Sequence, residues 1–264
     1  MKNLAIMMAI GAMVLTATAG AVTVKTETLK YTLGDRTMIG YVAYPTDLTT
    51  PRPAVLVVHE WYGLNAYAKR RAEQLAALGY VALAVDMYGD GKVAADAQEA
   101  ARLATTLKQD RAEMRKRARA GLDALQAFRF TDTNHLAAIG FCFGGTTALE
   151  LARSGAPLDA VVSFHGGLDS PHPDDGRNIK ASLLICHGAN DPFESASDMN
   201  AFQDELRKAG VDWQLVLFGN AVHSFSNPEA GNDPAKGAAY NEKAERRSWD
   251  LMQSFLRERF AAAK

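Results

Sequence analysis

Short runs of apolar residues alternate along this chain with longer stretches of helical periodicity, and this alternation constrains the fold more than any other feature. The first run, residues 54–58, has no polar interruption, as is typical of a strand buried on both faces of a sheet. Similar runs follow at residues 81–85, 136–141, 160–164, 182–186 and 214–218. Strands that alternate with helices form parallel sheets covered by helices on both faces, so the pattern predicts an α/β fold.

The segments between these runs have the periodicity of helices. They cover residues 66–78, 94–128, 146–153, 195–209 and 236–260, and the second is long enough to break near residues 108–110. Before the first buried run, residues 23–31 and 38–44 alternate apolar and polar side chains around Gly34 and Asp35. This alternation predicts an antiparallel hairpin at the edge of the sheet. Because no linker or internal repeat interrupts the pattern, we expect residues 22–264 to form a single domain.

The first 21 residues have the three-part layout of a secretory signal peptide. Lys2 precedes an uncharged apolar run over residues 4–15, and small residues follow at 17–21. The run is about a dozen residues long, whereas a membrane-spanning helix needs roughly 20. We expect cleavage after Ala19 or Ala21 and a mature protein that is periplasmic or secreted and free of the membrane.

The overall charge excludes one class of partner. The chain has 29 basic and 30 acidic side chains, for a formal net charge of −1. Nucleic-acid binding relies on positive charge that neutralises phosphates. We therefore expect no nucleic-acid partner.

The run at residues 136–141 leads into a motif that can carry chemistry. Gly140-Phe141-Cys142-Phe143-Gly144-Gly145 stands between a predicted strand and a predicted helix, which is the pattern of a nucleophile elbow with cysteine as the nucleophile. Gly140 and Gly144 allow the strained turn that this motif needs. The helix N-terminus favours a thiolate at Cys142, and the backbone N–H of Phe143 is free to bind an oxyanion.

Two candidate partners follow in the order nucleophile, acid, histidine. Asp191 follows the predicted strand at 182–186, and His223 follows the strand at 214–218. Ligands of such sheets bind beyond the carboxyl ends of the strands, where these residues are expected to meet. His223 is predicted to take the thiol proton as general base, and Asp191 to orient and stabilise its imidazolium.

The elbow, Asp191 and the segment His223-Ser224-Phe225 resemble the dienelactone hydrolase family of α/β-hydrolases, and the resemblance covers the whole mature chain. It implies the α/β-hydrolase fold and the hydrolysis of small-molecule esters or lactones without a cofactor or metal. It further implies that Glu60 interacts with the Cys142 thiol, and that the backbone N–H of Trp61 is the second oxyanion donor.

One departure from the family concerns the substrate. Where the family has an arginine that holds the substrate carboxylate, this chain has Asn227, four residues after His223. The basic residues at 111, 115, 116, 117 and 119 could replace it, but Glu113 among them favours an exposed helix face. An aromatic, apolar pocket suited to neutral esters is expected instead, formed by Trp61, Tyr62, Tyr88, Phe143 and Phe225.

The leading interpretation is a secreted cysteine hydrolase that forms a thioester acyl-enzyme. Its oxyanion hole could also receive a phosphoryl oxygen, so activated phosphotriesters are possible promiscuous substrates. A non-catalytic binding protein of the same fold is the alternative, and a thiol redox sensor a weaker one. A sensor needs a resolving cysteine, but Cys186 is predicted to lie two strands from Cys142, too far for a disulfide. The sequence favours no particular oligomeric state.

Overall fold

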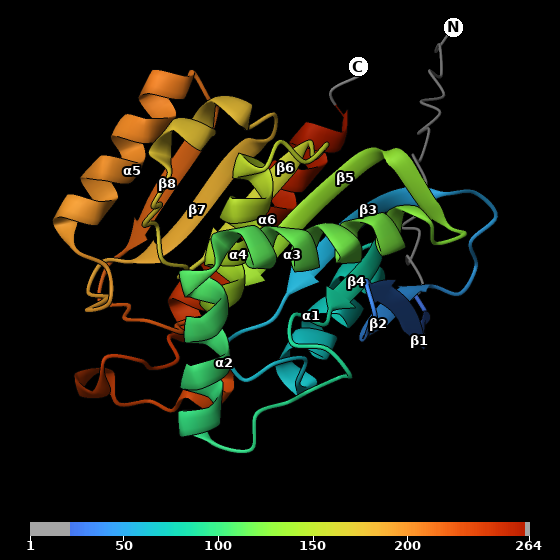
Figure 1. Cartoon of the computed structure of the whole chain (residues 1–264), viewed down its shortest axis with the longest axis horizontal. Helices are drawn as coiled ribbons and strands as arrows, with labels where there is room; N and C mark the ends of the chain where they lie inside the picture. The colour runs from blue at the N-terminus through green and yellow to red at the C-terminus, as the bar shows by residue number, and fades with distance from the viewer. Residues whose placement is uncertain (1–21, 262–264) are drawn as a thin grey trace, which may run out of the picture.

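A computed structural model of the chain describes residues 22–261 (Figure 1). These residues fold around one sheet of eight strands. The sheet has the order β1-β2-β4-β3-β5-β6-β7-β8. β1 and β2 form the predicted antiparallel hairpin, β2 pairs antiparallel with β4, and all the remaining pairs are parallel. The strands are β1 (Val24–Leu33), β2 (Arg36–Pro45), β3 (Arg52–Val58), β4 (Val81–Val85), β5 (Thr131–Phe141), β6 (Ala160–Phe164), β7 (Ser182–Gly188) and β8 (Trp213–Phe218). The predicted α/β-hydrolase architecture is confirmed.

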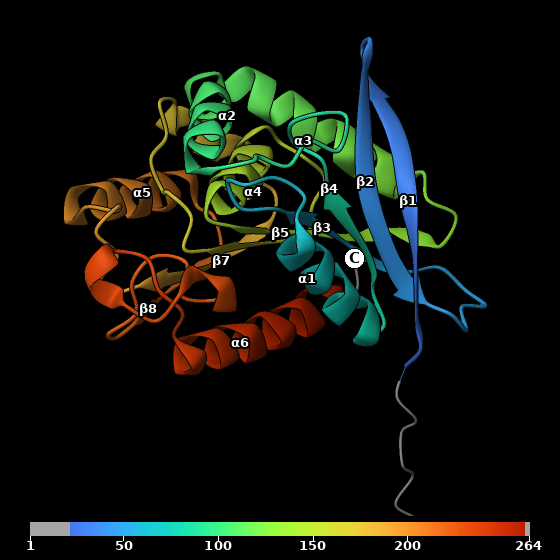
Figure 2. The same cartoon turned by 90° about the horizontal axis from the view of Figure 1, so that it is seen from below.

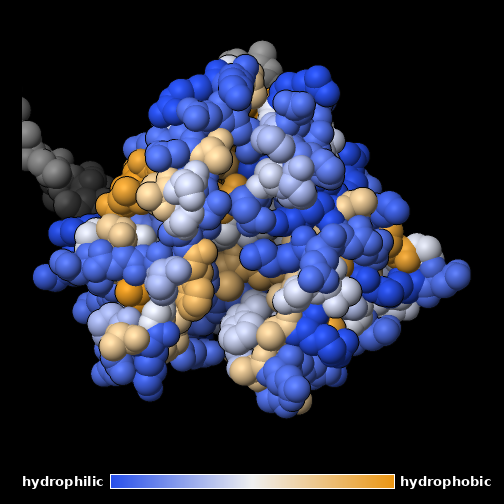
Figure 3. All heavy atoms as spheres, turned by 60° about the vertical axis from the view of Figure 1, so that its left-hand side comes forward, coloured by the Kyte–Doolittle hydropathy of each residue, from blue (hydrophilic) through white to orange (hydrophobic). Residues whose placement is uncertain are grey.

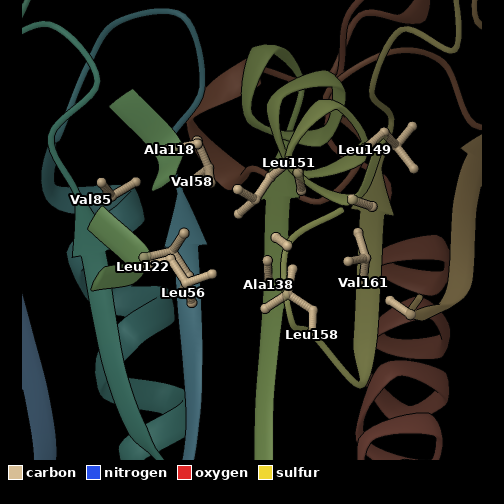
Figure 4. Packing of buried hydrophobic residues seen from close by; sticks show 14 of the residues in the cluster. Leu56, Val58, Val85, Ala118, Leu122, Ala138, Leu149, Leu151, Leu158 and Val161 are labelled. Atoms are coloured by element: carbon tan, nitrogen blue, oxygen red, sulfur yellow. The ribbon is translucent and has the colours of Figure 1, made fainter. Parts of the chain in front are cut away.

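Helices cover both faces of the sheet, as Figure 2 shows. One face carries α2 (Ala97–Gln109), α3 (Arg111–Gln126), α4 (Phe143–Arg153) and α5 (Ala196–Ala209), and the other carries α1 (Ala66–Ala77) and α6 (Glu242–Ala261). The central strands are apolar on both sides because each side faces a helix layer. Ala118 and Leu122 of α3, for example, lie against Leu56, Val58 and Val85 of the sheet (Figure 4).

Local sequence accounts for where two of the helices begin and end. The break predicted near residues 108–110 is confirmed at Asp110, which ends α2 and caps α3 by accepting a hydrogen bond from the N–H of Glu113 at 2.9 Å. The last helix begins at Glu242, later than predicted. A short 3₁₀ turn, Pro234–Lys236, and Gly237 with a φ of 83° precede it and interrupt the helical periodicity.

Only Lys116 and Arg119 of the basic residues on α3 are exposed, whereas the sequence favoured an exposed face for the whole group. Arg111 and Arg117 are buried, and Arg117 donates to the carbonyl of Met87 at 2.9 Å. Arg115 bridges Glu150 of α4 at 2.7 Å and Asp175 at 2.6 Å. These guanidinium groups link α3 to neighbouring elements, so their role is to stabilise the fold.

The face of the molecule seen in Figure 3 is largely hydrophilic, with hydrophobic side chains in separate small groups. Within residues 22–261, none of the helices combines the length and the hydropathy needed to cross a bilayer. The predicted signal peptide, residues 1–21, lies outside the described residues and stays a prediction.

Candidate active site

Cys142 stands at the turn between β5 and α4, where the sequence predicts a nucleophile elbow. Its backbone has a φ of 54° and a ψ of −119°, a conformation that L residues adopt only under strain. A Cβ at position 140 would collide with the carbonyl of Gly144, and a Cβ at position 144 would collide with the carbonyl of Val58. Both glycines are therefore required by the close approach of backbone segments around the thiol.

The three predicted partners meet at the carboxyl ends of their strands. His223 Nε2 lies 3.0 Å from Cys142 Sγ, and His223 Nδ1 lies 2.8 Å from Asp191 Oδ2. Asp191 is held in turn by the N–H of Phe193, which donates to Oδ1 at 2.9 Å. The structure thus brings Cys142, His223 and Asp191 into one hydrogen-bonded row.

The electrostatics of this row favour a protonated His223 beside an ionised Asp191. Burial alone would lower the pKa of His223, but the adjacent Cys142 and Asp191 outweigh it and raise this pKa to about 10. Burial would raise the pKa of Asp191, yet the hydrogen bond from His223 overcomes it and leaves this pKa below its usual range. A histidine held between a carboxylate and a cysteine is the arrangement that activates a cysteine nucleophile.

The two backbone N–H groups predicted to bind the oxyanion are free of other acceptors in the described part of the chain. Those of Phe143 and Trp61 donate to no acceptor within residues 22–261, as an oxyanion hole requires. The hydroxyl of Tyr88 donates to the carbonyl of Trp61 at 2.7 Å and thereby holds this loop. Tyr88 was predicted as a pocket residue, and the structure places it behind the oxyanion loop.

Glu60 is buried beside the triad but its carboxylate is engaged elsewhere. Oε2 accepts a hydrogen bond from Asn227 Nδ2 at 2.6 Å, and Oε1 accepts one from Ser224 Oγ at 3.2 Å. Burial raises the pKa of Glu60, and the hydrogen bond from Asn227 partly opposes this rise. The expected interaction with the Cys142 thiol is not made, because Asn227 and Ser224 bind the carboxylate and the thiol bonds to His223.

His165, which the sequence analysis did not select, also touches the nucleophile. It follows β6 with a φ of 41°, and its Nδ1 accepts a hydrogen bond from the N–H of Cys142 at 3.1 Å. Its Nε2 lies 2.7 Å from Ser226 Oγ. Burial holds the pKa of His165 well below its usual value, so the ring is neutral and acts as an acceptor. The sequence feature that could have identified His165 is its position directly after a predicted core strand.

The cavity beside Cys142 is small and more polar than predicted. Its volume is about 60 Å³. Its lining consists of Lys108, Cys142, Phe143, Thr146, His165, Gly166, Gly167, His187, Asp191, Phe193, Glu194 and His223. Of the five aromatic residues expected there, only Phe143 contributes. Phe225 is fully buried, with its ring against His165 and Phe218, and the Tyr62 ring packs edge-on against Trp61.

The other cysteine and the other titratable groups add no second centre in the part of the chain that the structure describes. Cys186 is fully buried in β7 and makes no disulfide with Cys142. No group of three or more His, Cys, Asp or Glu side chains among residues 22–261 is placed to hold a metal ion.

The sequence matches one known protein family over most of its length. The profile of the dienelactone hydrolase family matches residues 38–260, which include the elbow, Asp191 and His223. The chain belongs to the dienelactone hydrolase family. As a member of this family it is a hydrolase that acts on ester or lactone bonds.

Relatives support this assignment along the whole length of the domain. A putative carboxymethylenebutenolidase of Aquifex aeolicus is 29% identical over 83% of this chain and 92% of its own. Among solved structures, the dienelactone hydrolase-like promiscuous phosphotriesterase P91 from metagenomic libraries is 46% identical, with a TM-score of 0.85 over 90% of this chain and 99% of its own. A putative dienelactone hydrolase from Klebsiella pneumoniae, 22% identical with a TM-score of 0.75 over 89% of this chain and 98% of its own, has the same fold.

Proposed function

We propose that this member of the family hydrolyses small carboxylic esters or lactones through a thioester on Cys142. The observation that carries the proposal is the hydrogen-bonded row of Cys142, His223 and Asp191, with the thiol 3.0 Å from the imidazole. The resting partner of the thiol is His223 and not Glu60, so the nucleophile is already paired with its base before substrate arrives.

The geometry supports a two-step reaction. The Cys142 thiolate attacks the carbonyl carbon, and the N–H groups of Phe143 and Trp61 bind the oxygen that becomes negative. The C–O bond to the alcohol breaks, and the leaving oxygen takes the proton of the His223 imidazolium. Water then gives a proton to His223 and attacks the thioester, which releases the acid and restores the thiolate. For a lactone, the alcohol and the acid leave as one molecule.

Turnover of p-nitrophenyl acetate and butyrate by the mature protein tests this proposal. Replacing Cys142 by Ala should reduce turnover by roughly a thousandfold or more, because the nucleophile is lost. Cys142→Ser keeps the shape of the site but replaces the thiol with a less acidic hydroxyl, so it serves as the matched control and should also be impaired. Equal rates in all three proteins would contradict the proposal and favour a non-catalytic binding protein.

A second activity is supported by one relative. The phosphotriesterase P91 shares 46% of its sequence with this chain. We propose that the same oxyanion donors accept a phosphoryl oxygen, so that activated aryl phosphotriesters are promiscuous substrates. Release of p-nitrophenol from a dialkyl p-nitrophenyl phosphate, lost in Cys142→Ala, is the expected result, and no release by the active protein would refute it.

We also propose that the enzyme works outside the cytoplasm. Support comes from residues 1–21 alone, where Lys2, an uncharged apolar run and small residues have the order of a cleavable leader.

A further inference from the structure

Two polar side chains that line the cavity beside Cys142 have buried atoms that make no hydrogen bond within residues 22–261. Glu194 Oε2 accepts a hydrogen bond from the N–H of Leu168 at 3.2 Å, whereas Oε1 is buried and bonds to nothing within residues 22–261. The His187 side chain is 1% exposed, and neither ring nitrogen makes a hydrogen bond in the same part of the chain, although Nε2 lies 3.5 Å from Asp191 Oδ2. Buried polar atoms are rarely left unsatisfied, so both side chains are expected to bond to a ligand.

The surroundings of Glu194 are negatively charged. Burial and then the carboxylates of Asp198, Asp169 and Asp191 raise the pKa of Glu194 to about 7. Crowded carboxylates of this kind are stabilised by a cation and repel an anionic ligand.

The nearby cations do not cancel this field. His223, which lines the same cavity, is committed to Asp191 and Cys142. Arg111 is committed to Asp169, with an N–O distance of 2.6 Å. Lys108 also lines the cavity, but it is exposed, and water and salt screen an exposed charge more than a buried one. Outside the row of Cys142, His223 and Asp191, the half-buried carboxylate of Glu194 is therefore the stronger electrostatic feature of the cavity.

An aromatic ring completes the site. Phe193 lines the same cavity, is 66% exposed, and packs edge-on against His223 with ring centroids 5.1 Å apart. A carboxylate, a hydrogen-bonding imidazole and an open aromatic face are the groups that bind alkylammonium ions. The cavity volume of about 60 Å³ suits a small group.

We propose that this cavity recognises a small alkylammonium group on the ester substrate, with Glu194 and His187 as specificity-determining residues. The inference rests on the proposed function, because it names the substrate class of the same site. It distinguishes this chain from enzymes that select a carboxylate-bearing substrate.

Charged thiol reagents test the inference without ester turnover. Aminoethyl, methyl and sulfonatoethyl methanethiosulfonate are cationic, neutral and anionic, and each forms a mixed disulfide with Cys142 by releasing methanesulfinate. Rates are followed by intact mass and normalised to the rates with 2-mercaptoethanol, with Cys142→Ala as the blank. We expect the cationic reagent to react at least about tenfold faster than the anionic one.

Glu194→Gln is the deciding variant because it removes the charge and keeps the shape. The ratio of the cationic to the anionic rate should fall by about tenfold in this variant. His187→Leu should also lower this ratio. Lys108→Met is the matched control, in which the ratio should rise or stay. An unchanged ratio in Glu194→Gln would overturn the inference.

Three methyl esters of similar length then connect the cavity to turnover. Methyl 4-aminobutanoate, methyl pentanoate and monomethyl glutarate differ in charge at the end remote from the ester. We expect the kcat/KM ratio of the ammonium ester to the neutral ester to exceed one and to increase from pH 6 to pH 8 as Glu194 ionises. This ratio should fall in Glu194→Gln. If no ester is hydrolysed, the proposed function fails, while the reagent ratio still decides the charge preference of the cavity.

Discussion

Three residues around the reacting thiol have a positive φ although none is glycine. They are Cys142 at 54°, His165 at 41° and Ser224 at 53°. Each stands directly beyond a core strand or next to a triad residue, and each presents a side chain or backbone group to the site. Such strain persists only where the surrounding structure holds it, and it concentrates at functional sites.

Glu60 provides a test at the scale of one residue. Its folded pKa is raised by burial, so the folded state resists its ionisation. The contribution of Glu60 to the free energy of unfolding is therefore fully present below its ordinary pKa of about 4.5. It is lost as the pH rises through the folded pKa. We expect the free energy of unfolding, from urea titrations between pH 4 and pH 8, to decline less in Glu60→Gln than in the parent.

Asn227→Leu is the companion variant for this test. It removes the donor that partly lowers the pKa of Glu60, so the decline with pH should become steeper. In the double variant, Glu60→Gln with Asn227→Leu, the free energy of unfolding should no longer show this steeper decline with pH. Parallel pH curves in all four proteins would contradict a buried carboxylate held by Asn227.

The site residues that could be predicted from the sequence are those marked by a nearby sequence pattern. Cys142, Asp191 and His223 follow apolar runs, so their meeting could be predicted from the sequence. The partner of Glu60 could not, because Asn227 is 167 residues away in the chain and reaches Glu60 through a loop beyond β8. For the same reason Phe225, predicted to line the pocket, is buried in the core.

At the scale of elements, the β5-α4 turn depends on the absence of a side chain at position 140. Gly140→Ala would force a Cβ onto the carbonyl of Gly144 and shift the turn that carries Cys142. We expect esterase activity to fall by at least about a hundredfold, since small displacements of a nucleophile are costly. Gly219→Ala, where nothing lies within 4 Å of the added Cβ, is the control and should keep its activity.

A buried ion cluster joins α4 to α5. Arg153, with a side chain 1% exposed, bonds to Glu150 at 3.0 Å and to Glu205 at 2.8 Å. Arg153→Met would leave two buried carboxylates without this partner, and we expect it to lower the free energy of unfolding by about 3–5 kcal/mol. Urea unfolding at neutral pH measures the loss.

The exposed pair of Arg119 and Asp123 on α3 is the matched control for this cluster. Arg119→Met should change stability by less than about 1 kcal/mol, because exposed ion pairs contribute little. Similar losses in the two variants would contradict the structural role given to Arg153. Periodicity predicted these helices, but it placed the basic residues of α3 on an exposed face and could not reveal which of them are buried.

At the scale of the whole molecule, the parallel sheet gathers catalytic groups that are distant in sequence. Cys142, Asp191 and His223 follow β5, β7 and β8, and the carboxyl ends of these strands lie along the same edge. Alternation along the chain predicted this gathering. The polarity of the cavity was not predictable, because it comes from side chains such as His187 at the end of β7 and Glu194 on the following loop, and only the folded chain shows that they face one cavity.

The predicted signal peptide gives a testable expectation about export. When the full-length protein is expressed in a Gram-negative bacterium, we expect it in the periplasmic fraction with an N-terminus at residue 20 or 22, because residues 1–21 have the layout of a signal peptide. N-terminal sequencing and cell fractionation provide the measurement. An intact Met1 in the cytoplasmic fraction would contradict export.

The central claim is that acyl transfer passes through the thiol of Cys142. Mixing the mature protein with excess p-nitrophenyl acetate, quenching in acid within the first turnovers and mapping peptides by mass spectrometry tests it most directly. The account predicts one acetyl group on the peptide that contains Cys142, formed during turnover and lost as the substrate is consumed. An acetyl group on another residue, or continued turnover with Cys142 unmodified throughout, would contradict it.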